Sequence, residues 1–122
     1  MIGLADRITI RGLSVSASHG VLDAERSSRQ PFLVDLDVYL DLSTAGASDS
    51  LRDTLDYADL AARAHDLVAT ESHNLIERVA AGLAEMVLAN QRVERVVVTV
   101  HKPEAPVTVD FDDIAVRIDR RR

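Results

Sequence analysis

An alternation of apolar and polar residues between positions 32 and 42 constrains the fold of this chain more than any other feature. Successive side chains of a β-strand point to opposite faces, so this period predicts a strand with one face in a core and the other in water. The apolar positions are Phe32, Val34, Leu36, Val38, Leu40 and Leu42, and the residues between them include Asp35, Asp37, Tyr39 and Asp41.

Three other segments are expected to be strands. The first runs from Ile8 to Val15, and its alternation slips by one residue at Gly12, as a β-bulge would produce. A β-branched run within Val93–Lys102 is typical of a buried strand, and Pro103 is expected to end it. The last strand is expected over Phe111–Arg117.

Two helices are expected between the second and third strands. The first follows an N-cap at Asp56, the second extends from about Leu75 to Asn90, and each carries one apolar stripe at helical spacing. The stretch 43–50 is expected to be a loop, and the polar stretch 21–30 is a candidate functional loop. Strands that flank paired helices indicate an α+β fold, with an antiparallel sheet and both helices packed on one face.

Composition narrows the class of protein. A chain of 122 residues is expected to form a single domain over 1–122. The net charge of −6, with one basic run at Arg120–Arg122, argues against a nucleic-acid partner. The sequence has no cysteine, no signal peptide pattern and no membrane-length apolar run, so we expect a soluble, cytoplasmic protein. Its open sheet edges favour a homo-oligomer, such as a ring of sheets.

Lys102 is the first candidate for chemistry. It shares a strand face with Val96, Val98 and Val100, so its amine is delivered to the rim of the apolar layer. The plain alternative is a strand-end lysine whose stem covers the core while its head reaches water.

Other candidates also have structural readings. Glu77 follows Asn74 by three residues, which is the spacing of a helix capping box. Tyr57 could be a half-buried aromatic residue at a helix start, and Glu25 could simply be solvated. A metal site is disfavoured, because the histidines do not pair at ligand spacing. These histidines are His19, His65, His73 and His101.

A set of short blocks spans nearly the whole chain in a fixed order. They are Gly12-Leu13, His19–Arg26, Gln30–Asp35, Asp53–Tyr57, Asn74–Glu77, Val100–Pro106 and Phe111–Val116. Together, these blocks resemble the dihydroneopterin aldolase family. The resemblance implies the tunnelling fold (ββααββ), in which the sheets of four subunits join into an oligomeric β-barrel. Two such rings stack into a homo-octamer, with active sites between neighbouring subunits.

The resemblance also implies an activity. Members of the family cleave 7,8-dihydroneopterin by a retro-aldol reaction into 6-hydroxymethyl-7,8-dihydropterin and glycolaldehyde, a step of folate biosynthesis, and often epimerise the side chain. No metal and no cofactor is implied, because the pterin ring itself can accept the electrons. The alternatives are an epimerase of dihydroneopterin triphosphate and a non-catalytic pterin-binding assembly module.

By the same resemblance, Glu77 would bind the amino edge of the pterin ring, and Lys102 would handle protons on the substrate hydroxyl. Tyr57 would protonate the intermediate at carbon, and Glu25 would position water or substrate near the lysine. Tyr57 is expected from one subunit, and Glu77 with Lys102 from its neighbour. The other ring-lining residues would be Val21, Ile76, Thr54 and Leu55.

Overall fold

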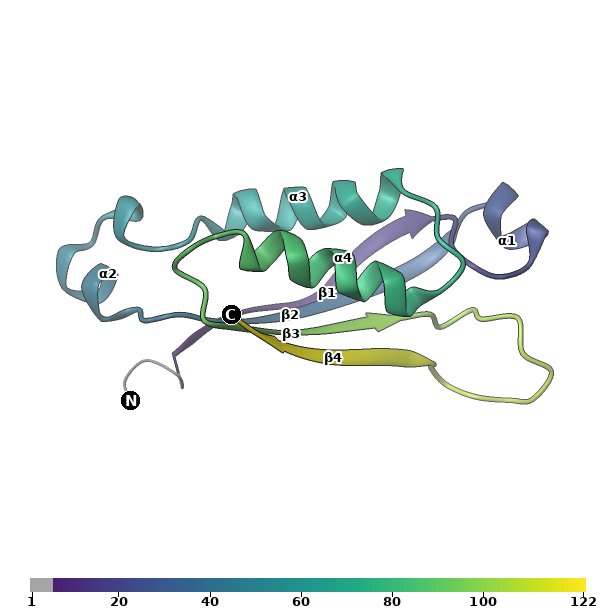
Figure 1. Cartoon of the computed structure of the whole chain (residues 1–122). Helices are drawn as coiled ribbons and strands as arrows, with labels where there is room; N and C mark the ends of the chain where they lie inside the picture. The colour runs from purple at the N-terminus through teal and green to yellow at the C-terminus, as the bar shows by residue number, and fades with distance from the viewer. Residues whose placement is uncertain (1–5) are drawn as a thin grey trace.

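The computed structural model describes residues 6–122 and shows one four-stranded antiparallel sheet with two long helices on one face (Figure 1). The strands lie side by side in the order β1-β2-β3-β4. The elements in chain order are β1 (Arg7–Ala17), α1 (Asp23–Ser27), β2 (Gln30–Tyr39), α2 (Ser43–Ser48), η1 (Leu51–Asp53), α3 (Tyr57–Thr70), α4 (Ile76–Leu88), β3 (Arg95–His101) and β4 (Ala115–Arg121). The predicted α+β class is confirmed.

Strand β2 supplies the centre of the core, as its alternation predicts. Phe32, Leu36 and Val38 are fully buried in a cluster with apolar residues of α3 and α4. Burial of one such side chain contributes about 1.5–3 kcal/mol. Asp37 lies on the other face and accepts a hydrogen bond from Thr9 at 2.9 Å, but it is itself buried, so this face is polar without lying fully in water as expected.

The predicted bulge in β1 is also confirmed. The pairing of β1 with β2 shifts register between Ile10 and Leu13, and Gly12 has a left-handed φ of 65°. Glycine adopts this conformation without the steric cost that other residues meet. The Gly12 N–H donates to Asp35 Oδ1 at 2.8 Å, which ties the bulge to the neighbouring strand.

The helices begin as expected, but one ends early. Asp56 is the N-cap of α3, and its carboxylate accepts from the backbone N–H groups of Ala58 and Asp59 at 3.0 and 3.2 Å. Helix α4 ends at Leu88 rather than at Asn90. The Asn90 side chain accepts from the Arg92 N–H at 2.9 Å, which favours a turn over another helical residue.

Two further expectations about boundaries were wrong. Strand β4 starts at Ala115, which pairs with His101, so all of 111–114 precedes the ladder. The ladder cannot extend further because Pro103 lacks the N–H that would continue it. The stretch 43–50 contains the short helix α2, which Ser, Thr and Ala residues alone do not distinguish from a loop.

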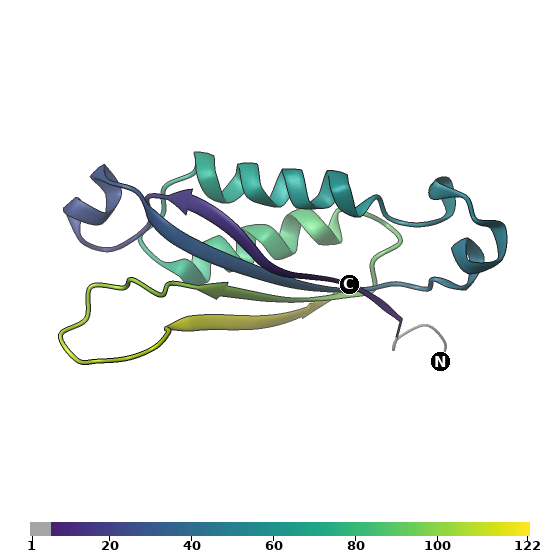
Figure 2. The same ribbon diagram turned by 180° about the vertical axis from the view of Figure 1, so that it is seen from behind.

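No helix in the described part of the chain covers the sheet face opposite α3 and α4 (Figure 2). Arg95 makes a two-pronged contact with Asp119, at 2.9 and 2.6 Å, and its guanidinium lies over the Tyr39 ring. Strands β1 and β4 form the two edges. Within residues 6–122, every helix is too short or too polar to cross a lipid bilayer.

Candidate active site

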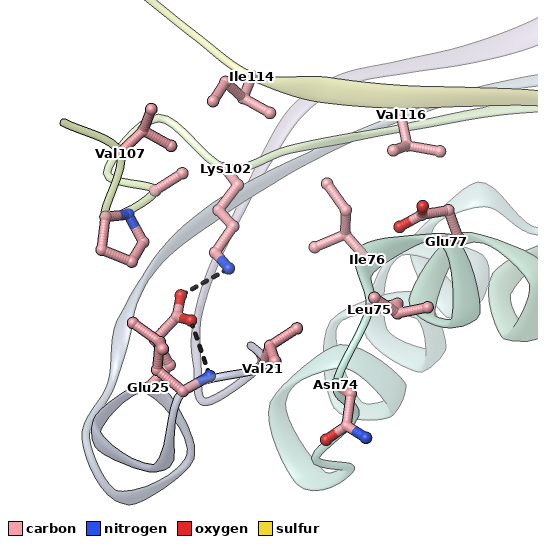
Figure 3. Close-up of a pocket in the computed structure, with 13 residues that line it drawn as sticks. Val21, Glu25, Asn74, Leu75, Ile76, Glu77, Lys102, Val107, Ile114 and Val116 are labelled. Atoms are coloured by element: carbon pink, nitrogen blue, oxygen red, sulfur yellow. Dashed lines mark hydrogen bonds and ion pairs between the residues drawn. The ribbon is translucent and has the colours of Figure 1, made fainter. Parts of the chain in front are cut away.

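A cavity of about 450 Å³ opens where β3 ends and α4 begins (Figure 3). Its walls come from the loop before α1, the first turn of α4 and the connection from β3 to β4. Most wall side chains are apolar, including Val21, Ile76, Val107, Ile114 and Val116. Two carboxylates, Glu25 and Glu77, and one amine, Lys102, share this space.

Lys102 enters the cavity directly after β3. Val98 and Val100 are fully buried beneath the helices, and Lys102 continues their face of the strand. Its backbone N–H donates to the Ile114 carbonyl at 2.7 Å, and only 12% of its side chain is exposed. The alternative of a head group in water is therefore wrong. The sequence has 14 Lys and Arg residues, and Lys102 is the only lysine among them.

Glu25 is the partner of this amine. Its Oε2 atom lies 2.6 Å from Lys102 Nζ, and it also accepts from Gln30 Nε2 at 3.3 Å. Burial alone would raise the pKa of Glu25, but the hydrogen bonds from Lys102, the Leu22 N–H and Gln30, with the charge of Lys102, together outweigh it, so the pKa lies below its ordinary value. The alternative of a solvated glutamate is wrong, because 9% of the side chain is exposed.

Gly20 makes room for this ion pair. A Cβ atom at position 20 would lie 2.2 Å from the Glu25 side-chain carboxyl carbon, which no real structure accommodates without a shift. The Gly20 N–H donates to the His73 carbonyl at 2.9 Å, so the backbone here is also fixed to the α3–α4 connection.

Glu77 lies in the first turn of α4 and faces the cavity with its neighbour Ile76 (Figure 3). The capping-box reading is wrong, because Leu75 is the N-cap and the helix start has no side-chain cap. The Glu77 carboxylate makes no hydrogen bond within residues 6–122 and is solvent-exposed. It is therefore available to a ligand that presents parallel N–H donors.

Arg26 and His19 connect the segments on either side of the ion pair. Arg26 donates to the carbonyls of Gly20 and Val21 at 2.9 and 2.6 Å, and to Asn74 Oδ1 at 3.3 Å. The fully buried His19 contacts the Val68 carbonyl through Nε2 at 2.8 Å and accepts the His73 N–H through Nδ1 at 3.0 Å. Each side chain links the loop before α1 to the segment after α3.

Three predicted site residues lie elsewhere. Thr54 and Leu55 line a separate cavity of about 170 Å³, and Tyr57 begins α3 with 66% of its surface exposed. Helix α3 has 14 residues and therefore spans about 21 Å, which places Tyr57 far from Lys102 within one chain. The structure thus brings Lys102, Glu25, Glu77, Ile76 and Val21 together, and it separates them from Tyr57, Thr54 and Leu55.

Comparison with known proteins identifies the family. The sequence profile of dihydroneopterin aldolases matches residues 8–119. The chain belongs to the dihydroneopterin aldolase family. The dihydroneopterin aldolase of Streptomyces coelicolor is 44% identical over 117 residues, which cover 96% of this chain and 98% of that protein.

Solved structures of dihydroneopterin aldolases share the fold. The E. coli enzyme in complex with neopterin superposes with a TM-score of 0.86 at 33% identity, covering 94% of this chain and 98% of that chain. The enzyme of Burkholderia thailendensis bound to guanine superposes with a TM-score of 0.82 at 25% identity, covering 99% and 96%. The resemblance in the sequence is confirmed, and the activity of the chain is that of a dihydroneopterin aldolase, a lyase of the folate pathway.

Sequence reasoning missed the residues that shape the aldolase cavity. Arg26 and His19 were not assigned roles, because the contacts that define them reach across about 50 positions of the chain. The apolar wall formed by Val107 and Ile114 belongs to an irregular connection with no period to detect. A usable signal was the presence of one lysine in a chain whose other basic residues are all arginine.

Proposed function

We propose that the cavity binds the pterin ring of 7,8-dihydroneopterin, and that the Lys102–Glu25 pair takes up the hydroxyl proton whose loss starts cleavage of the substrate side chain. The observation that carries this proposal is the 2.6 Å contact between Lys102 Nζ and Glu25 Oε2 in a mostly apolar wall. An amine and a carboxylate at this distance can together take up a proton from a bound hydroxyl.

Recognition of the ring would fall to Glu77. Neopterin and guanine, the ligands of two structural relatives, both present an amino group beside a ring N–H. A carboxylate accepts two parallel hydrogen bonds from such an edge. Ile76 and Val21 would cover the faces of the flat ring, and their positions in the cavity wall support this assignment.

The proposed reaction breaks the bond between the first and second side-chain carbons of the substrate. The hydroxyl proton on the second carbon passes to the Lys102–Glu25 pair, and that carbon becomes the aldehyde of glycolaldehyde. The electron pair of the broken bond moves into the C=N bond of the ring, whose nitrogen takes up a proton. Tyr57 then protonates the first side-chain carbon while the ring nitrogen loses its proton.

Tyr57 would come from a neighbouring subunit, together with Thr54 and Leu55. The distance across α3 supports this arrangement, because one chain cannot bring Tyr57 to its own Lys102. We propose the ring of four subunits and the octamer of two rings as the assembly that joins these half-sites. The unpaired edges of β1 and β4 are suited to such closure. The absence of cysteine is in keeping with a cytoplasmic setting.

The two alternative functions make different demands on the cavity. A triphosphate substrate needs several cations, whereas Lys102 is the one cation among the described cavity-lining residues and is already paired with Glu25. The geometry therefore favours the unphosphorylated substrate and cleavage over a triphosphate epimerase. A non-catalytic binding module would not need the Lys102–Glu25 pair at all.

The test is the release of glycolaldehyde from 7,8-dihydroneopterin by the purified protein. We expect turnover without a covalent adduct, so borohydride added during turnover should leave the mass at Lys102 unchanged. Because the chain has a single lysine, mass spectrometry can settle this point without ambiguity. A trapped imine would contradict the proposed mechanism, and no aldehyde release would contradict the proposed function.

A further inference from the structure

His101 occupies the strand position next to Lys102 but points to the opposite face of the sheet. Its Nε2 atom lies 2.7 Å from Asp35 Oδ2, and its Nδ1 atom lies 2.6 Å from Asp113 Oδ2. A carboxylate can only accept hydrogen bonds, so this geometry requires both ring nitrogens to donate. The arrangement is therefore that of a positively charged imidazolium between two carboxylates.

The surroundings of the ring favour that charge. Burial alone would lower the pKa of His101, but the hydrogen bonds with Asp35 and Asp113 outweigh it and raise the pKa above its ordinary value. Asp35 reaches the ring from β2, and Asp113 reaches it from the segment before β4. The positive charge of Arg11, on β1, helps to lower the pKa of Asp35, one of the two carboxylates that contact the ring.

Asp113 connects this imidazolium to the cavity. The residue after it, Ile114, lines the cavity, and its carbonyl accepts the Lys102 N–H at 2.7 Å. The connection 103–114 contains no helix or strand and carries Val107, another wall residue (Figure 3). The contact with His101 holds the returning end of this irregular connection to the end of β3.

We propose that the imidazolium of His101 is a positioning residue of the active site, which fixes the apolar wall carried by the connection 103–114 through Asp113. This inference rests on the proposed function, because it assumes that the wall contacts the pterin ring. A neutral imidazole can donate only one hydrogen bond, so loss of the second proton leaves one carboxylate facing a lone pair. The wall then loosens, and pterin affinity falls.

The test compares the dissociation constant of neopterin for the wild-type protein and for His101→Gln between pH 6 and pH 9. The ratio of the two constants is taken at each pH, which cancels the ionisation of the ligand itself. Since charge-assisted hydrogen bonds are among the strong ones, we expect a ratio of about five to ten near pH 6. The ratio should approach one as the pH rises through the raised pKa of His101.

Two other variants make the comparison specific. His65→Gln is the matched control, because His65 is exposed on α3 and its one side-chain hydrogen bond among residues 6–122 is to Asp66, at 3.4 Å. Its ratio should stay near one at every pH. Asp113→Asn replaces the charged acceptor on the other side of the same contact by a neutral amide, and should weaken binding as His101→Gln does. If His101→Gln does not fold, Asp113→Asn carries the test alone.

The outcomes separate this inference from the function on which it rests. A ratio that stays near one at pH 6 for both His101→Gln and Asp113→Asn would overturn the positioning role while the aldolase function stands. A ratio that is raised equally at all pH values would show a structural role that does not depend on charge, and would also overturn it. Wild-type protein that neither binds neopterin nor releases glycolaldehyde would overturn both.

Discussion

The Nζ atom of Lys102 and the Oε2 atom of Glu25 are 2.6 Å apart, although one residue directly follows a central strand and the other lies in a five-residue helix. The contact makes the two groups an ion pair. It also explains why each side chain can remain charged at the edge of an apolar wall, since each compensates the other's loss of hydration.

Replacement of Lys102 should separate binding from catalysis. We expect Lys102→Met to lower kcat by about 10²–10⁴-fold, the usual contribution of general acid–base catalysis, while neopterin affinity changes little. Lys102→Arg is the control for charge, because it can keep the ion pair with Glu25 but does not give up its proton. Rates of glycolaldehyde release measure both variants, and wild-type turnover by Lys102→Arg would refute proton transfer at this position.

Glu77→Gln should weaken substrate binding rather than slow the chemical step. The variant loses a charge-assisted pair of hydrogen bonds, so we expect KM to rise by about 10–100-fold with kcat nearly unchanged. Glu85→Gln is the matched control on the same helix, since Glu85 contacts only Arg78 at 3.4 Å. Equal kinetics for the two variants would contradict the role of Glu77 as an anchor.

Gly20→Ala should damage the ion pair. The added Cβ would lie 2.2 Å from the Glu25 carboxyl carbon, so Glu25 has to move away from Lys102. We expect turnover to fall by about tenfold or more, because small displacements at a reacting site are costly. Gly46→Ala is the control, since nothing lies within 4 Å of its added carbon, and it should retain wild-type activity.

His19 should make the protein less stable in weak acid. Burial lowers the pKa of His19 below its ordinary value of 6.5, although the hydrogen bond to the Val68 carbonyl acts the other way. As the pH falls below about 6.5, the unfolded chain binds a proton that the folded protein does not, so the free energy of unfolding decreases.

Urea unfolding of the wild type and His19→Gln between pH 7 and pH 5 measures this effect. The wild type should lose more stability over that range than the variant, because the other titrating groups are common to both. A variant with the same pH dependence as the wild type would show that His19 is not the group responsible.

Mixed oligomers should reveal sharing of sites between subunits. Tyr57→Phe and Lys102→Met are each expected to be inactive in cleavage, but a mixture places an intact Tyr57 beside an intact Lys102 at some interfaces. Random one-to-one assembly of two such chains restores about a quarter of the shared sites. Activity measured after co-refolding should approach that fraction, and no recovery would indicate sites contained within one chain.

Local signals in the sequence were sufficient for the sheet, the bulge at Gly12 and the cap at Asp56, because each depends on a few adjacent residues. The capping box at Glu77 was predicted as an alternative from correct spacing but did not form, since the helix begins one residue later than that motif requires. Spacing alone cannot detect such a shift of one residue.

The candidate site could be predicted from the sequence only in part, for a different reason. Lys102, Glu25 and Glu77 stand out by residue type and by the family resemblance, whereas Arg26 and His19 act through backbone carbonyls of distant segments. A carbonyl is present at every position, so the sequence carries no mark of which one is used. Long-range contacts of this kind appear only when the chain is folded.

The length of α3 has a consequence for the evolution of this chain. The helix separates Tyr57, at its start, from Asn74 of the cavity wall, which follows its end, so in the proposed assembly it sets the distance between two half-sites of neighbouring subunits. Insertion of one helical turn would lengthen α3 by about 5.4 Å and, in the proposed ring, would change that distance at every subunit interface. Surface loops commonly tolerate insertions and deletions, but in the proposed assembly a change in the length of α3 would alter every shared site.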